Sequence, residues 1–285
     1  MLSAFDDRPW QMDPGERAAL EGLLCQVRPH LAIEIGTAEG GSVRLLAKYS
    51  DHVHSFDLVA APSHVQKLTN VSTHTGDSHL LLPGVLAELA HASRNVDFVI
   101  VDGDHSADGV ERDVRDLLAS KAVSATVIVL HDTMNDEVRA GLGRIDLANE
   151  PKVATFEPEF VAGRLHYRNG LHHQLWGGLG VLMIGGPGSS GTSPASADPE
   201  AYTMYELIAP VRDALLAQER NRKPAGPSRV RDALAAAHSS DDEISRLRAE
   251  LAELQRNFDS VANSKSWRLT TPLRAAASML RTGRS

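Results

Sequence analysis

Between residues 14 and 130, short apolar runs alternate with segments of helical periodicity, and this alternation constrains the fold more than any other feature of the sequence. The runs with the length and composition of strands are 31–35, 52–58, 71–75, 96–101 and 125–130. The segments with helical spacing are 14–28, 42–49, 80–92 and 110–120. Strands that alternate with helices form a parallel sheet, so the sequence predicts a Rossmann-like, doubly wound α/β domain with a mostly parallel sheet.

The pattern loosens after residue 135, and the remaining chain predicts an extension of this domain. A last short strand at 179–184 ends the domain, which we assign to residues 1–185. Residues 186–200 are rich in Gly, Ser and Pro and predict a flexible loop, followed by a helix at 201–220. Residues 229–285 predict a coiled-coil-like helix and a tail.

The coiled-coil prediction rests on apolar residues spaced by three and four from Ile244 to Val261, a seam of about three heptads. Such a seam suits a homo-oligomer or a partner helix. Because about three heptads make a short coiled coil, the helix could equally pack on its own domain. The sequence leaves these two possibilities open.

Charge and composition exclude several classes of protein. The chain of 285 residues has a net charge of −8 and no basic stripe, so we expect no nucleic-acid partner. It has no apolar run of about 18 residues, so we expect no membrane span, and its start does not read as a signal peptide. A single cysteine, Cys25, excludes an internal disulfide framework and fits a reducing cytoplasm, so we expect a cytoplasmic protein.

A glycine-bearing turn follows the first predicted strand, at the end where open parallel sheets bind their ligands. Glycine lets the backbone turn tightly and approach a ligand, while the next helix offers free N–H groups. The spacing is not that of a dinucleotide fold and no Walker lysine follows, so the turn alone suits many nucleotides. The candidate cofactor-binding residues of this turn are Glu34, Gly36, Thr37, Ala38, Glu39 and Gly40.

The next two strands also end in polar residues. Asp57 lies at the end of the second strand, where a carboxylate can accept hydrogen bonds from both hydroxyls of a ribose. Asp77 and Ser78 follow the third strand, and Asp77 could accept from an adenine amino group. Each acid taken alone could instead be a strand-end cap. Their ordered succession favours a cationic nucleoside ligand.

The fourth and fifth strands end in a second set of polar residues. Asp102 and His105 follow the fourth strand, and His131 and Asp132 follow the fifth. Neighbouring strands lie about 4.8 Å apart, so side chains at adjacent strand ends can share one ion. Carboxylate oxygens suit Mg²⁺ or Mn²⁺, whereas an imidazole ligand favours Mn²⁺ or another transition metal. We therefore predict a divalent metal site made by Asp102, His131 and Asp132.

Residues 25–185, through the succession of motifs above, resemble class I S-adenosylmethionine-dependent methyltransferases. The segments around Asp102 and Asp132 are similar to the metal-dependent O-methyltransferases that act on sugars of macrolides and glycans. This resemblance implies S-adenosylmethionine as cofactor, a divalent metal, Asp102 as a metal ligand that also borders the cofactor, and His105 as general base. Where those relatives have an acidic pair after the fifth strand, this chain has His131 and Asp132. That departure leaves the identity of the metal open.

The acceptor is less constrained than the chemistry. The polar, histidine-rich segment 164–176 fits a carbohydrate, with Trp176 or Tyr167 as a stacking surface. Residues 264–274 resemble a tail found on bacterial glycan-assembly proteins, and biosynthesis of partly methylated mannose polysaccharides of actinobacteria is one candidate pathway. We therefore expect a sugar or glycan acceptor. The alternatives are a catechol-type methyltransferase, a cofactor-binding partner of an oxygenase, and a scaffold of glycan enzymes that has lost catalysis.

Overall fold

The computed structural model describes residues 10–166, 173–185 and 203–221. Seven strands form one sheet in the order β3-β2-β1-β4-β5-β9-β6. The strands of this sheet are β1 (Leu31–Ile35), β2 (His52–Asp57), β3 (Val71–Thr75), β4 (Phe98–Val101), β5 (Thr126–His131), β6 (Val153–Val161) and β9 (Leu179–Ile184). A separate two-stranded sheet pairs β7 (Arg164–His166) with β8 (Gln174–Trp176).

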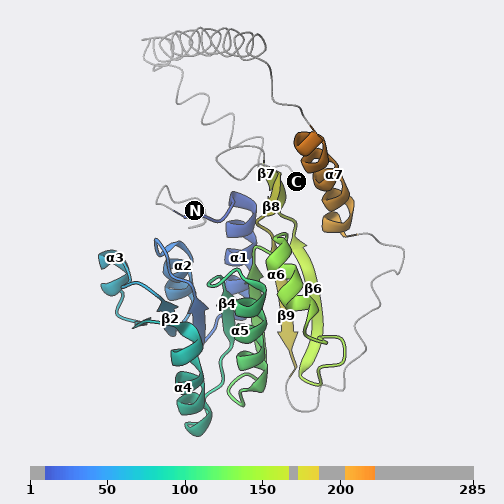
Figure 1. Cartoon of the computed structure of the whole chain (residues 1–285). Helices are drawn as coiled ribbons and strands as arrows, with labels where there is room; N and C mark the ends of the chain where they lie inside the picture. The colour runs from blue at the N-terminus through green and yellow to red at the C-terminus, as the bar shows by residue number, and fades with distance from the viewer. Residues whose placement is uncertain (1–9, 167–172, 186–202, 222–285) are drawn as a thin grey trace, which may run out of the picture. The chain divides into compact units, whose positions relative to one another are not determined.

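The five strands from β1 to β5 are parallel, whereas β9 runs antiparallel between β5 and β6. The helices are α1 (Pro14–Val27), α2 (Gly41–Tyr49), α3 (Ser63–Gln66), α4 (Ser78–His91), α5 (Ala107–Ala119), α6 (Asp136–Gly143) and α7 (Met204–Asn221). Figure 1 shows strands and helices alternating along the chain from α1 to β5. The prediction of a doubly wound, mostly parallel sheet is confirmed.

Two apolar clusters fill the space on the two faces of the sheet. One cluster joins the sheet to α4, α5 and α6 through residues such as Leu86, Val114 and Val138. The other joins it to α1 and α2 through residues such as Leu24 and Leu46. Because β1 and β4 are buried along their whole length, they are apolar throughout except for Glu34.

Side-chain caps fix where several helices begin. Asp13 and Glu16 form a capping box at α1, and Pro14 occupies the first helical turn. Asp77 caps α4, so that helix begins at Ser78, two residues earlier than predicted. Pro83 therefore lies in the second turn of α4 instead of the first, where its missing N–H leaves the helix one hydrogen bond short.

Several elements were not predicted, namely α3, α6, β6, β7 and β8. The strand β6 is half-buried, carries Pro158, and pairs with β9 across two register irregularities. Proline is tolerated on an edge strand or at a bulge because no ladder hydrogen bond is lost there. The apolar alternation of a regular strand is thus weakened in β6, which explains why periodicity did not identify it.

The helix predicted at 201–220 corresponds to α7, which is anchored at its start by acidic side chains of the α/β domain. Glu159 accepts hydrogen bonds from the N–H groups of Met204 and Tyr205 at 2.6 and 3.0 Å. Asp136 accepts from the Tyr205 hydroxyl at 2.5 Å and pairs with Arg212. Carboxylates at a helix N-terminus satisfy free N–H groups and complement the helix dipole.

The predicted loop at 186–200, the seam from Ile244 to Val261 and the tail at 264–274 lie outside the described residues. By their contacts the described residues up to Glu219 belong to one compact unit. None of the described helices combines the length and apolar character needed to cross a membrane.

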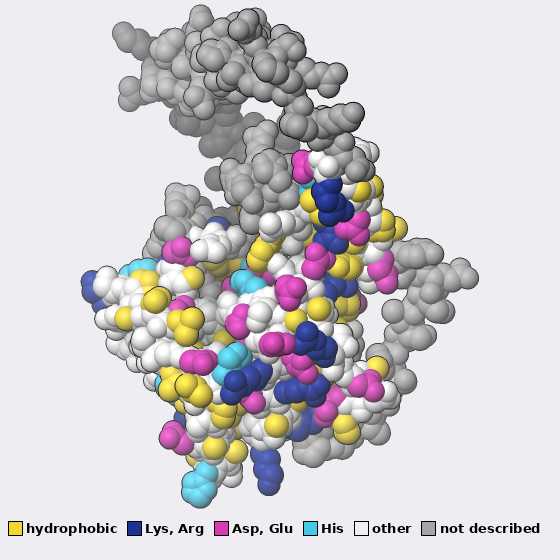
Figure 2. Space-filling model, viewed as in Figure 1, with side chains coloured by type: hydrophobic (Ala, Val, Ile, Leu, Met, Phe, Trp, Pro, Cys, Tyr) yellow, Lys and Arg dark blue, Asp and Glu magenta, His cyan; other side chains and the backbone are white. Residues whose placement is uncertain are grey.

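Charged side chains of both signs lie among hydrophobic and other side chains on the face of the α/β domain seen in Figure 2. Lys and Arg lie among Asp and Glu over α5 and α6, where Arg115 pairs with Glu111 and Arg144 with Asp108. Exposed pairs of this kind contribute at most about 1 kcal/mol each. The described residues on this face therefore present a mixed, balanced surface.

Candidate active site

A cavity of about 610 Å³ lies where β1, β2, β3 and β4 end. Its position matches the crevice in which open α/β sheets bind ligands, beyond the carboxyl ends of the strands. The predicted site residues that line it are Gly36, Thr37, Ala38, Glu39, Asp57, Asp77, Ser78, Asp102 and His105. Residues after four different strands thus share one cavity.

The turn after β1 requires glycine at Gly36. Its φ is +96°, and a Cβ at this position would lie 2.0 Å from the backbone oxygen of Asp102. Glycine is the residue that adopts this backbone conformation without a steric cost, and it also permits the close approach of the two loops. Gly36 is therefore the point where the turn after β1 meets the turn after β4.

Asp57 orders the turn after β1. One carboxylate oxygen accepts from the N–H groups of Thr37 and Ala38 at 2.9 and 2.8 Å, and the other accepts from the N–H of Val59 at 3.0 Å. The carboxylate also borders the cavity, where the predicted contact with ribose hydroxyls would form. Asp57 thus has a structural task that the sequence did not reveal.

Two of the predicted cofactor residues, Glu34 and Gly40, do not line the cavity. Glu34 is fully buried, and its carboxyl group accepts hydrogen bonds from Ser42 and Ser55 at 2.5 and 2.6 Å. Burial raises the pKa of Glu34 to about 8. Glu34 therefore ties β1 to α2 and β2, and direct contact with a ligand would require it to leave both hydroxyls.

The far side of the cavity combines predicted and unpredicted residues. Asp77 caps α4 by accepting from the N–H of His79 at 2.9 Å, which is the structural role that the sequence left open. Trp10, Gln11 and Met12 also line the cavity, although no sequence pattern singled them out. The Trp10 ring lies so close to the start of α2 that a Cβ at Gly41 would be 2.2 Å from it.

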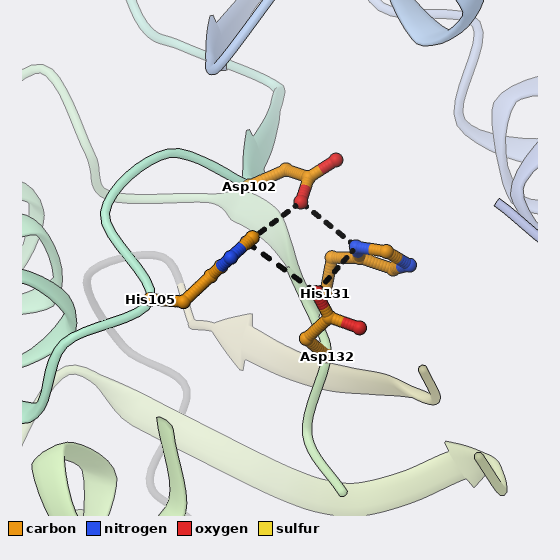
Figure 3. Close-up of side chains that lie close together, drawn as sticks. All are labelled: Asp102, His105, His131 and Asp132. Carbon is orange, nitrogen blue, oxygen red and sulfur yellow. Dashed lines mark hydrogen bonds and ion pairs between the residues drawn. The ribbon is translucent and has the colours of Figure 1, made fainter. Parts of the chain in front are cut away.

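Asp102, His105, His131 and Asp132 converge at the ends of β4 and β5, as Figure 3 shows. One donor atom from each of the four lies within 4.8 Å of the others. Nε2 of His105 is 3.2 Å from Oδ1 of Asp102 and 3.4 Å from Oδ2 of Asp132. Nδ1 of His131 is 2.8 Å from the same Asp102 oxygen and 3.6 Å from the same Asp132 oxygen.

The backbone explains how two consecutive residues, His131 and Asp132, reach one cluster. In a strand, successive side chains point to opposite faces of the sheet, so neighbours in sequence normally diverge. Here β5 ends at His131, and Asp132 adopts a left-handed conformation with φ +55°. That conformation is uncommon outside glycine, although Asp adopts it more readily than most residues. The turn brings both side chains to the same point.

The charges of the four side chains compensate one another. Burial by itself raises the pKa of Asp102, but His131 and His105 outweigh it and lower that pKa to about 2. Burial by itself lowers the pKa of His131, but Asp102, Glu16 and Asp132 hold it well above its ordinary value. The hydrogen bond to Asp102 raises the pKa of His105.

This donor set fits a divalent cation. The two carboxylates and the two imidazoles point at one another, so that protons on the imidazoles balance the negative charge of the carboxylates. A bound divalent cation would balance this charge in place of the protons. The predicted ligands Asp102, His131 and Asp132 lie together, and the predicted base His105 lies beside them.

Several residues near this cluster were missed or misassigned. Glu16 of α1 is buried, and its carboxylate lies 3.4 Å from Nε2 of His131, across 115 positions of sequence. No pattern in the sequence singled out Glu16 or gave a sign of this contact. The Trp176 ring meets the His105 ring edge-on, with centroids 5.7 Å apart. The carboxylate of Asp104, next to His105 in sequence, accepts from the Ser106 N–H.

The remaining histidines of the segment 164–176 make other contacts. His166 ends β7, and His173 lies 3.5 Å from Glu219. Tyr167 and His172 lie outside the described residues. Trp176, the predicted stacking residue that the described structure includes, lies against His105.

Comparisons with known proteins identify one family model that matches part of the chain. Residues 33–133, from β1 to just beyond β5, match the family model of a methyltransferase domain. A search of curated proteins finds no match.

Solved structures of similar fold include an O-methyltransferase from Bacillus cereus in complex with SAH, at 19% identity and a TM-score of 0.43, covering 64% of this chain and 86% of that chain. The O-methyltransferase TomG from Streptomyces achromogenes, in complex with SAM, has 18% identity and a TM-score of 0.46, covering 65% and 87%. The methyltransferase MycE, in complex with Mg, SAH and mycinamycin VI, has 18% identity and a TM-score of 0.38, covering 62% and 50%. The chain has a Rossmann-like fold with a mostly parallel sheet, and residues 33–133 match the family model of a methyltransferase domain.

Proposed function

We propose that the chain is an S-adenosylmethionine-dependent O-methyltransferase that methylates a hydroxyl of a sugar or glycan with the help of a divalent cation. The observation that carries the proposal is the convergence of Asp102, His105, His131 and Asp132 beside the cavity. Asp102 and His105 line the cavity themselves, so the cluster borders the space in which a cofactor and an acceptor would meet.

The cofactor assignment rests on the cavity and on its lining. A volume of about 610 Å³ lies within the usual range of small-molecule sites and suits a nucleoside with an amino-acid arm. Asp57 and Asp77 offer carboxylates at the ends of β2 and β3, and the N-terminus of α2 offers free N–H groups. S-adenosylmethionine would supply the methyl group.

The metal assignment rests on the donor set. Asp102, Asp132 and His131 supply two carboxylates and one imidazole, a mixture that suits Mn²⁺ better than Mg²⁺. A bound divalent cation would stabilise negative charge that develops on an acceptor hydroxyl. Removal of the cation should therefore reduce turnover while leaving binding of the cofactor largely intact.

His105 is the imidazole best placed to receive the proton of the acceptor. Its side chain is 34% exposed and lines the cavity, whereas that of His131 is 7% exposed and does not. A neutral His105 would take the hydroxyl proton as the oxygen accepts the methyl group, and no covalent intermediate on the protein is required. His131 is then a ligand and His105 the general base.

The acceptor assignment rests on Trp176 and on the polar groups around it. An indole ring beside the base offers the flat surface on which the C–H face of a sugar can stack. A catechol-type acceptor, the second candidate, would also place a hydroxyl at the metal. The neighbouring polar side chains Arg164, His166 and Gln174 favour the carbohydrate.

A screen with methyl-labelled donor tests the proposal. Purified full-length chain is incubated with neutral sugars, oligosaccharides and catechol, with Mn²⁺, with Mg²⁺ or after treatment with EDTA. Transfer to a sugar that EDTA abolishes and Mn²⁺ restores is expected. Transfer to catechol alone would favour the second candidate. Tight binding of S-adenosylhomocysteine without transfer to any acceptor would favour a non-catalytic role. Full activity after EDTA treatment would contradict the proposed role of the metal.

A further inference from the structure

We propose that Glu16, together with the Gly177–Gly178 turn, holds His131 and Asp132 in the orientation that binds the metal. Glu16 acts as a positioning residue: it keeps the proton of His131 on Nε2, so that the Nδ1 lone pair faces the ion. This inference rests on the metal site proposed above. It adds a contribution from α1 and from the β8–β9 connection, both of which lie far from that site in sequence.

Glu16 is held rigidly before it reaches His131. Its side chain is 4% exposed. One carboxylate oxygen accepts from the N–H of Asp13 at 2.6 Å, and the other accepts from the N–H of Gly178 at 2.5 Å. Hydrogen bonds to a carboxylate from backbone N–H groups are among the stronger ones in proteins. The position of the carboxylate is therefore fixed by two different segments.

His131 has its two ring nitrogens on two different carboxylates. Nδ1 faces Oδ1 of Asp102 at 2.8 Å inside the cluster, and Nε2 faces Oε2 of Glu16 at 3.4 Å outside it. A neutral imidazole has one N–H and one lone pair, so the acceptor at Nε2 decides which nitrogen can bind a metal. Carboxylates in this position commonly fix the tautomer of metal-binding histidines.

The Gly177–Gly178 turn orients the carboxylate of Asp132. The N–H of Gly177 donates to Oδ1 of Asp132 at 2.6 Å, which leaves Oδ2 as the oxygen that faces both histidines. The φ values of the two glycines are +75° and +91°. A Cβ on Gly177 would lie 2.9 Å from Glu16, so a side chain there would displace the carboxylate.

A purely structural role for Glu16 would account for only one of these contacts. The capping box of α1 needs the hydrogen bond from Asp13 and neither of the other two. Glu21, on the same helix, provides a matched comparison. It is also fully buried, and its carboxylate accepts hydrogen bonds from Lys48 and Tyr49, which belong to α2. Loss of either carboxylate should lower the free energy of unfolding, but of the two only loss of the Glu16 carboxylate should weaken metal binding.

The first test compares Glu16→Gln with Glu21→Gln in the full chain. Binding of Mn²⁺ alone is measured by electron paramagnetic resonance, with thermal unfolding and S-adenosylhomocysteine calorimetry as controls for folding. In Glu16→Gln an amide N–H₂ must face one of the donors, so Mn²⁺ affinity should fall about 10–100-fold, the usual effect of losing such a partner. Glu21→Gln should bind Mn²⁺ like the wild type. Equal Mn²⁺ affinity in folded Glu16→Gln and wild type would overturn the inference.

A second test does not depend on Glu16→Gln folding. Nitrogen-15 NMR of the wild type loaded with diamagnetic Mg²⁺ should show the His131 proton on Nε2; a proton on Nδ1 would overturn the inference. Gly177→Ala changes no proposed ligand, yet it should also weaken Mn²⁺ binding because its Cβ displaces Glu16. A wild type that binds neither Mn²⁺ nor Mg²⁺ would instead remove the proposed metal site, and this inference with it.

Discussion

At the β1–β3 side of the cavity, the predicted cofactor residues that line it lie at or just after the ends of the strands that carry them. At the β4–β5 side, the four clustered residues also lie at or just after the ends of their strands, but His131 contacts Glu16 from α1 and Asp132 contacts the turn between β8 and β9. The first side is built from contacts that are mostly local to three strands and their loops. The second needs segments separated by up to 162 positions of sequence.

This difference predicts that cofactor affinity and metal affinity depend on different residues. Changes on the cofactor side should affect cofactor affinity and leave the metal alone, and changes on the metal side should do the reverse. Gly36 and Asp102, whose backbones are in close contact, are where the two sides meet. The expectations below test how independent the two sides are.

The largest effect is expected from Asp132→Asn. An amide keeps the size of the side chain and tolerates the left-handed backbone, but it lacks the charge that binds a cation. Loss of several kcal/mol of charge stabilisation corresponds to a fall in turnover of about 10³-fold or more. Calorimetry should show S-adenosylhomocysteine affinity within a few-fold of wild type. A parallel loss of both affinities would mean that the two sides are one unit.

His105→Ala should lower turnover about 10²–10⁴-fold, the usual contribution of a positioned general base. Because the base must be neutral, wild-type turnover should fall as the pH drops through the His105 pKa, and the variant should lose this acidic limb. Its Mn²⁺ affinity should stay near the wild-type value. If Mn²⁺ binding disappears instead, His105 is a ligand and the base lies elsewhere.

Asp57→Ala should weaken S-adenosylhomocysteine binding about 10–150-fold, since hydrogen bonds to a charged group are worth about 1.5–3 kcal/mol. The loss has two sources: the predicted ribose contact, and the N–H groups of Thr37 and Ala38 that lose their acceptor. Mn²⁺ affinity, measured on the same sample, should not change. Unaltered cofactor affinity would contradict the role of Asp57.

Glu34→Gln should have the smallest effect on catalysis and is measured as stability. The pKa of Glu34 is raised from 4.5 to about 8 in the folded chain, so between these pH values the folded state keeps a proton that the unfolded state releases. The contribution of Glu34 to the free energy of unfolding of the wild type is fully present below about pH 4.5. It is lost as the pH rises towards 8, by at most about 1.4 kcal/mol per pH unit.

Urea unfolding of cofactor-free protein at pH 5 and pH 8 measures this effect. The glutamine side chain carries no proton to lose, so the variant should gain stability relative to the wild type as the pH rises. The hydroxyl of Ser42 or Ser55 can donate a hydrogen bond to the amide oxygen of the glutamine, and the amide N–H₂ can donate to the hydroxyl of the other serine. Identical pH dependence in both proteins would show that Glu34 keeps an ordinary pKa.

Much of the sheet could be predicted because strand and helix periodicity are local properties. The strands at 31–35, 71–75 and 179–184 were predicted with the bounds that the structure has, and the others of β1–β5 differ by one or two residues. The rule that ligands lie beyond the carboxyl ends of parallel strands then indicated the lining residues. The edge strand β6 and the hairpin of β7 and β8 escaped because irregular or very short strands carry little periodicity.

The sequence by itself determined the alternation of strands and helices and the polar residues at the strand ends, from which a shared ion site of Asp102 and His131 was predicted. The structure pairs β4 with β5 and brings these two side chains together. Only the tertiary structure decided that Glu16 contacts His131, that Asp57 orders a loop, and that Glu34 is enclosed. The physical reason is the distance along the sequence over which each interaction acts. Backbone rules act over a few residues or one strand pair, whereas a contact across 115 positions depends on how whole elements pack.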